Sequence, residues 1–165
     1  DEEQKYEVVL FVYDISQGMA KALSMGLVGT QLDGIWHTGL IVYGYEYYYG
    51  GGIQAALPGQ TMVHCTRATA LQAGKPMMTH KIGYTSLPQE VFHDYLRSIS
   101  PRQADSLVFT AATYSLLKWN CNNFTSECSK FLTGGDIPSY ITGLPEEALN
   151  TPMGQMFKPF IMQME

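Results

Sequence analysis

The fold of this chain is decided by the stretch Lys118-Trp119-Asn120-Cys121-Asn122-Asn123-Phe124, which joins a predicted strand to a predicted helix. Residues 113–117 are strand-like, and after Cys121 apolar residues recur at helical spacing until Gly134-Gly135. Asn120 is a favourable N-cap, so we expect Cys121 in the first turn of this helix. Unpaired backbone N–H groups and the positive end of the helix dipole favour a thiolate there. The stretch therefore indicates Cys121 as a candidate nucleophile.

The composition is that of one globular domain spanning residues 1–165. The chain is 45% hydrophobic and 15% charged, which fits a folded core and not a disordered segment. Its net charge of −5, with no basic stripe, argues against a nucleic-acid partner. No apolar run is long enough to span a membrane, and Asp1–Lys5 does not resemble a signal peptide. We expect a soluble protein of the cytoplasm and nucleus.

The three cysteines, Cys65, Cys121 and Cys128, do not form a recognisable framework. Their number is odd, no two make a C-x-x-C pair, and no zinc-ligand spacing is present. We therefore expect no disulfide framework, no metal and no cofactor, and a reducing compartment. Cys128 falls among the apolar residues of the predicted helix, which indicates a core position, and Cys65 has no activating feature.

The pattern before Cys121 predicts an α+β fold. Residues 6–13 form a nearly continuous apolar run, which is typical of a central strand. Residues 34–43 predict the next strand, with His37 near its start, and Gly44 turns the chain into a hairpin partner at 45–49. Gly50, Gly51 and Gly52 follow.

Further elements are expected along the rest of the chain. Residues 55–80 predict an irregular excursion with short strands, followed by a strand at 81–85. A helix at 88–99 is expected to be capped by Ser86. We expect residues 137–141 to be extended and two helices to follow, at 144–149 and 153–164.

The candidate chemistry is a Cys121/His37 pair. Cysteine supplies a nucleophile, and histidine can take its proton and then protonate the leaving amine. Cysteine is also a common core residue, so spacing alone leaves a structural role for Cys121 open. The remaining histidines, His64, His80 and His93, are expected to have surface or structural roles.

Several stretches, in order from near the N-terminus almost to the end, resemble the PPPDE family. This family comprises permuted papain-fold peptidases, and its best known members are the DeSI desumoylating isopeptidases. The matching stretches are Val12-Tyr13-Asp14, Gly34-Ile35-Trp36-His37-Thr38, Glu46–Ile53, Pro58–Thr61, Asn120–Phe124, Phe131–Gly134, Ile137–Ile141, Leu144-Pro145 and Thr151–Gln155. The combination of G-I-W-H-T with N-C-N-x-F is quite specific, whereas either motif alone is not.

The resemblance implies a fold with a small, mostly antiparallel sheet packed by helices. It also implies that His37 and Cys121 are the catalytic residues. It also implies a homodimer, with a groove at the subunit interface for the Gly-Gly tail of SUMO or another ubiquitin-like modifier. Gly50, Gly51 and Gly52 are candidates for the wall of that groove. The backbone N–H of Cys121 is expected to help hold the oxyanion. Candidates for shaping the oxyanion pocket are Trp36, Trp119 and Asn120.

The sequence thus predicts a cysteine isopeptidase that cleaves a ubiquitin-like modifier, SUMO first, from lysine. The stretch between Thr61 and Ile82 is longer than the family pattern, so it bears on substrate identity. No residue is identified as a third member of a triad. Two alternatives stay open: a protein S-acyl thioesterase that uses the same dyad, and a non-catalytic dimeric binding module.

Overall fold

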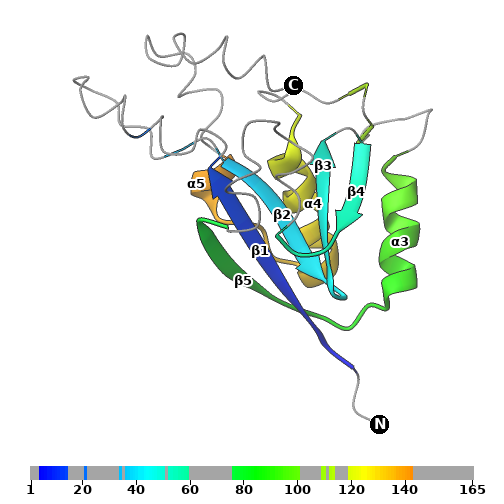
Figure 1. Cartoon of the computed structure of the whole chain (residues 1–165). Helices are drawn as coiled ribbons and strands as arrows, with labels where there is room; N and C mark the ends of the chain where they lie inside the picture. The colour runs from blue at the N-terminus through cyan, green and yellow to red at the C-terminus, as the bar shows by residue number, and fades with distance from the viewer. Residues whose placement is uncertain are drawn as a thin grey trace.

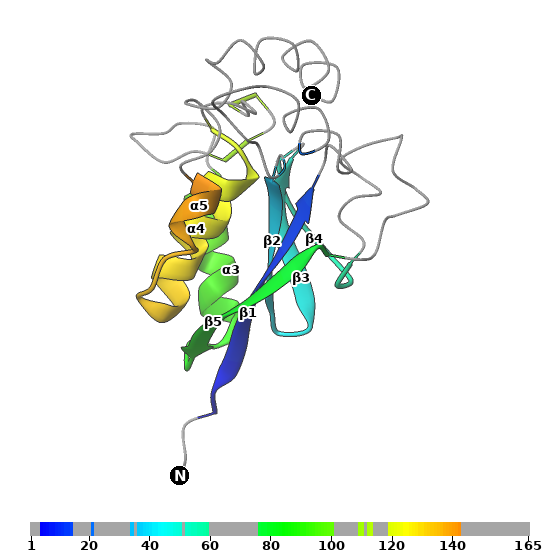
Figure 2. The same ribbon diagram turned by 90° about the vertical axis from the view of Figure 1, so that its left-hand side faces the viewer.

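The protein is an antiparallel sheet covered by helices. A computed structural model describes residues 4–14, 21, 34, 36–50, 52–59, 76–100, 109–110, 112–113 and 119–142. Five strands form one sheet in the order β4-β3-β2-β1-β5, and every pairing is antiparallel (Figure 1). The view along the sheet shows helices α3, α4 and α5 on the same face (Figure 2). The strands are β1 (Tyr6–Asp14), β2 (Trp36–Val42), β3 (Tyr45–Gly50), β4 (Gly52–Ala56) and β5 (Met78–Thr85), and the helices are α3 (Gln89–Ser98), α4 (Cys121–Thr133) and α5 (Ser139–Thr142).

Strand β1 lies inside the sheet because it pairs with β2 on one side and β5 on the other. Its alternate residues Val8, Leu10 and Val12 are fully buried in the core, as the alternation of side chains along a strand requires. Strands β2 and β3 are joined at Tyr43-Gly44, where both residues have positive φ, 56° and 82°. Positive φ at both central residues is what a two-residue type I′ hairpin needs, and it explains the glycine.

Helices α3 and α4 close the core over this sheet. Phe92 of α3 packs edge-on against Tyr47 of β3, with ring centroids 4.9 Å apart. The two helices meet where Tyr95 stacks on Phe131 at 3.9 Å. The buried cluster takes its remaining residues from both layers: Val8, Leu10, Val12, Trp36, Leu40, Val42, Tyr49, Leu96, Ile99, Phe109, Phe124, Cys128, Leu132, Ile137 and Ile141.

The α+β fold with an antiparallel sheet is confirmed, and so are the strands beginning at Tyr6 and Tyr45 and the helix that begins at Cys121. The expected cap of α3 is wrong. The helix begins three residues after Ser86, and the carbonyl of Pro88 accepts from the N–H groups of Val91 and Phe92 at 3.1 and 3.3 Å.

Two other expectations also need correction. Residues 139–141 are helical and not extended, because Pro138 begins a turn in which its carbonyl accepts from Ile141 N–H at 3.1 Å and Ile141 is buried. Strand β5 begins at Met78, inside the stretch expected to be irregular, because residues 78–80 pair with β1. The expected segments at 114–117, 144–149 and 153–164 and most of the 55–80 excursion lie outside the described residues.

Candidate active site

The N-terminus of α4 is fixed by a reciprocal capping box. The side-chain oxygen of Asn120 accepts from the backbone N–H groups of Asn122 and Asn123, at 2.8 and 3.4 Å. The Asn123 side chain accepts in return from Asn120 N–H at 2.8 Å. This arrangement satisfies backbone donors that a helix start otherwise leaves unpaired. It makes Cys121 the first residue of the helix, as the sequence predicts.

Asn122 joins this helix start to β2. Its amide Nδ2 donates to the carbonyl of Trp36 at 3.1 Å, and its Oδ1 accepts from the Thr38 hydroxyl at 2.7 Å. These two contacts hold the residues on either side of His37. Thr38 is also 2.7 Å from the hydroxyl of Thr125, one helical turn further along α4. The buried polar cluster therefore sets the position of the helix relative to the strand.

The sulfur of Cys121 lies within this cluster, next to the strand residue that follows His37. Its Sγ is 3.7 Å from Asn122 Oδ1, and the backbone of Thr38 is close enough to hydrogen bond to the thiolate. Strand β2 pairs with β3 from Leu40 to Val42, so Thr38 lies beyond the end of this pairing. Figure 1 shows the start of α4 at the same end of the sheet as the start of β2.

The ionisation of Cys121 differs from the sequence expectation. The side chain is 1% exposed, and burial raises the pKa of its thiol to about 11, although nearby backbone groups of Thr38, Asn122 and Cys121 act in the opposite direction. The expectation that the helix start makes a thiolate is wrong for this state, because removal from water penalises the charged form more than these groups favour it.

His37 is enclosed on the other side of β2. It is 3% exposed, and burial lowers the pKa of its imidazole to about 4. Its ring lies 5.6 Å from that of Tyr13 and 6.1 Å from that of Tyr48, measured between centroids. At neutral pH the site therefore holds a neutral thiol and a neutral imidazole, which can act as a proton acceptor.

The other predicted site residues lie near this end of the sheet in different roles. Trp36 is buried and packs edge-on against Tyr140 at 6.1 Å. Trp119 stacks on Phe109 at 4.6 Å, and Asn120 caps the helix. Their part in an oxyanion pocket stays a prediction.

Gly50 ends β3 and Gly52 begins β4. Gly50 pairs with Gly52, whose φ is 100°, while Gly51 lies outside the described residues. The register of β2 and β3 places these two glycines at the end of the sheet that carries His37. The role of the triplet as a groove wall stays a prediction.

The remaining cysteines and histidines are placed away from this pair or outside the described residues. Cys128 is fully buried, and burial raises its pKa, in keeping with the expected core position. His93 is 2.8 Å from the Tyr47 hydroxyl, and His80 is 2.6 Å from that of Tyr140. Both hydrogen bonds fit the structural roles expected of these histidines. His64 and Cys65 lie outside the described residues.

Sequence reasoning missed the supporting residues of the site. The Asn122 bridge could have been suspected from an asparagine that directly follows the candidate nucleophile Cys121. Glu46 gave a second signal, because it is the acidic residue in a strand of tyrosines. Its carboxylate is fully buried and accepts from the Tyr13 hydroxyl at 3.0 Å.

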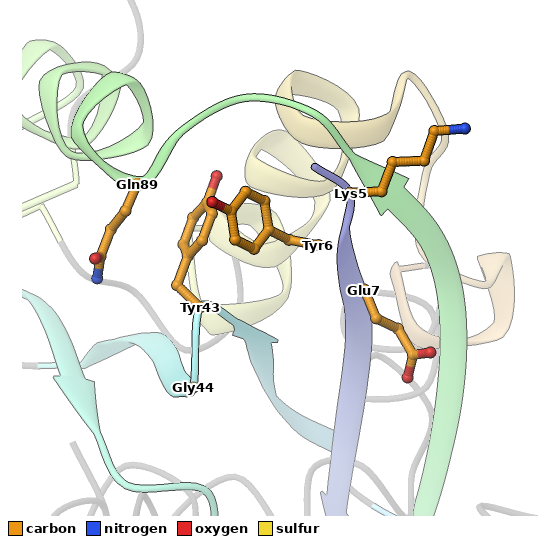
Figure 3. A pocket seen from close by; sticks show the side chains of 6 residues that line it. All are labelled: Lys5, Tyr6, Glu7, Tyr43, Gly44 and Gln89. Carbon is orange, nitrogen blue, oxygen red and sulfur yellow. The ribbon is translucent and has the colours of Figure 1, made fainter. Parts of the chain in front are cut away.

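A shallow hollow lies at the opposite end of the sheet, beside the β2–β3 hairpin. Figure 3 shows the rings of Tyr6 and Tyr43 next to one another, with Gln89 facing them. The hollow is lined by Lys5, Tyr6, Glu7, Tyr43, Gly44 and Gln89. It shares no residue with the Cys121/His37 site.

The described part of the chain has neither a membrane-spanning helix nor a group of metal ligands. No helix there has the length and apolar character needed to cross a bilayer. Within the same residues, no three or more His, Cys, Asp or Glu side chains are grouped as metal ligands.

A family model and several known proteins indicate the same family for this chain. Residues 6–162 match the model of the "PPPDE putative peptidase domain". Desumoylating isopeptidase 1 of Xenopus laevis is 42% identical over 160 residues, covering 96% of this chain and 86% of that protein. The human protein of the same name is 42% identical over 94% of this chain and 84% of its own length. DeSI-like protein sdu1 of Schizosaccharomyces pombe is 31% identical over 88% and 67%. The chain belongs to the PPPDE peptidase family.

Proposed function

We propose that the protein is a cysteine isopeptidase that removes a ubiquitin-like modifier, SUMO first, from lysine side chains. The observation that carries the proposal is the position of the Cys121 sulfur, at the first turn of α4 and against the backbone of Thr38, the residue that follows His37 in β2. The relatives named desumoylating isopeptidase 1, which match nearly the whole chain, support the same substrate class.

The proposed reaction starts from a neutral Cys121 thiol and a neutral His37 imidazole. As the sulfur attacks the carbonyl of the modifier's terminal glycine, His37 takes the thiol proton, so the thiolate forms only during attack. The backbone N–H of Cys121 stabilises the oxyanion. His37 then gives the proton to the lysine amine, which leaves. Water, deprotonated by His37, hydrolyses the thioester and releases the modifier with a free carboxylate.

The substrate tail reaches this site along a groove at the interface of a homodimer, with Gly50–Gly52 as part of its wall. Glycines suit such a wall because a side chain would narrow the space for a Gly-Gly tail. The enzyme acts in the cytoplasm and nucleus. The free thiols of Cys121 and Cys128 are compatible with these reducing compartments.

The direct test measures cleavage of a SUMO-conjugated protein by the wild type, Cys121→Ala, Cys121→Ser and His37→Ala. All three variants should lose turnover while their circular dichroism spectra stay unchanged. Cys128→Ala is the matched control, because it removes the other described thiol, which lies in the core. Wild-type cleavage by Cys121→Ala would overturn the mechanism.

A parallel assay separates the alternative functions. The hydrogen-bonding groups beside the sulfur belong to Thr38 and Asn122 and suit a polar substrate such as a peptide tail. We expect slow hydrolysis of a fluorogenic acyl thioester compared with a SUMO conjugate, and the reverse order would indicate a thioesterase. A SUMO-derived C-terminal electrophile should label Cys121, and failure to label it would indicate a binding module.

A further inference from the structure

We propose that Tyr13, anchored by the buried carboxylate of Glu46, is the positioning residue that holds the His37 imidazole in its reactive orientation. The inference rests on the proposed function, in which His37 moves the proton. Three neighbouring strands supply the three side chains. Tyr13 of β1 pairs with His37 of β2, and Glu46 of β3 pairs with Ile41 of β2. Because side chains alternate along a strand, Tyr13, His37 and Glu46 all lie on one face of the sheet.

Glu46 is built into this face as an anchor. Its side chain is fully buried, and its two carboxylate oxygens are each 3.0 Å from the hydroxyl of Tyr13. The backbone N–H of Gly59 donates to the same carboxylate at 2.7 Å. Burying a carboxylate is costly unless hydrogen bonds compensate for the lost water. These contacts therefore fix the Tyr13 hydroxyl at one place.

The absence of a side chain at Gly39 of β2 leaves the space that the Glu46 carboxylate occupies. A Cβ atom added at Gly39 would overlap the Glu46 carboxylate, so the side chain lies directly across the strand. Gly39 is two residues beyond His37 and on the same face. The anchor thus lies against the strand that carries the imidazole.

Tyr13 passes this constraint to His37 through its ring. The two ring centroids are 5.6 Å apart with an interplanar angle of 39°. Tyr48 confines the imidazole from another direction, at 6.1 Å and 78°, but its hydroxyl donates to the neutral amide of Gln54 at 3.1 Å. Hydrogen bonds to a carboxylate are the stronger kind. The two tyrosines are therefore a matched pair that differ in their anchor.

The first experiment compares these tyrosines in the full-length protein on a SUMO conjugate. Tyr13→Phe keeps the ring and loses the anchor, so kcat should fall roughly 10- to 100-fold with KM within about twofold, as expected for a misplaced proton carrier. Tyr48→Phe should stay within about threefold of the wild type. Equal losses in the two variants, or no loss in Tyr13→Phe, would overturn the proposal.

A third variant separates position from charge. Glu46→Gln keeps an oxygen for Gly59 N–H and a polar partner for Tyr13, but it has no charge. We expect its kcat to lie between those of the wild type and Tyr13→Phe, because a neutral amide keeps the contact to Tyr13 but makes it weaker. A loss as large as that of Tyr13→Phe would show that the charge acts directly and would contradict a positioning role.

The second experiment is independent of turnover. Proton–nitrogen correlation spectra of the histidine rings report tautomer and environment, with His37→Gln assigning the His37 signal. We expect one tautomer in the wild type and in Tyr48→Phe, and a shifted or mixed signal in Tyr13→Phe. An unchanged His37 signal in Tyr13→Phe would overturn this inference even if SUMO cleavage holds. A shifted signal in a protein that does not cleave SUMO would reject the proposed function alone.

Discussion

At Cys121 two effects of the fold act on one thiol in opposite directions. The helix start stabilises negative charge by about 0.3–1 kcal/mol, or up to about 2 kcal/mol when partly buried. Full burial can move a pKa by up to roughly 3–5 units against the charged form. Burial prevails here, and the thiol is neutral at pH 7. The resting site therefore differs from a preformed thiolate–imidazolium pair.

The alkylation rate of Cys121 tests this state. Because only the thiolate reacts, carbamidomethylation by iodoacetamide should rise about tenfold per pH unit from pH 7 to 10. The rate should level off only near the raised pKa of about 11. Mass spectrometry of the peptide that carries Cys121 separates it from Cys128. A rate that levels off below pH 8 would show that the ion pair already exists at rest.

The sequence predicts Cys121 and His37 as the catalytic residues but not their ionisation. Cys121 and His37 are recognisable because a capped helix start and a strand start are local patterns. The burial of His37 depends on Tyr13 and Tyr48, which the pairing of β1 and β3 with β2 brings around its ring. Strand pairing between distant residues is not visible in a local pattern, so neither the pKa shifts nor the anchor of His37 could be predicted.

Within α4, the Asn120 cap stabilises the same first turn that carries the candidate nucleophile Cys121. Asn120→Ala removes the acceptor for two backbone N–H groups and should lower the free energy of unfolding by about 1 kcal/mol. Asn120→Ser, which keeps a capping oxygen, should recover most of this loss. Urea denaturation of the three proteins measures the difference. An unchanged midpoint for Asn120→Ala would contradict a stabilising cap.

Local signals explain which elements were foreseen. Strand β1 was predictable from its apolar run, and α4 from Asn120 at one end and Gly134 at the other, where φ is 79°. The α5 turn was missed because Ile141 gains its helical contact from burial against the core, not from sequence periodicity. The start of β5 was missed because Met78 is held by pairing with Val12 of β1, far away in the sequence.

At the scale of the whole molecule, the sheet separates packing from chemistry. Helices α3 and α4 cover one face and contribute to the apolar core, and α4 carries the candidate nucleophile Cys121 (Figure 2). The strands carry His37, Tyr13 and Glu46 on the opposite face. The sulfur lies against the backbone of Thr38, the residue that follows His37, close to the end of β2 where its ladder with β3 has stopped. Folding of the complete sheet is therefore needed before either residue acquires its environment.

The free energy of unfolding should depend on pH because His37 is buried in its neutral form. Its pKa is about 4 in the folded protein and 6.5 in a model peptide, so the unfolded chain binds a proton first as pH falls. The stabilisation is complete above pH 6.5 and is lost as pH falls towards 4, by about 3 kcal/mol in all. His37→Gln lacks this titration. Urea unfolding from pH 7 to 4 should therefore show a steeper loss for the wild type than for His37→Gln, whereas parallel curves would mean that the imidazole reaches solvent in the folded protein.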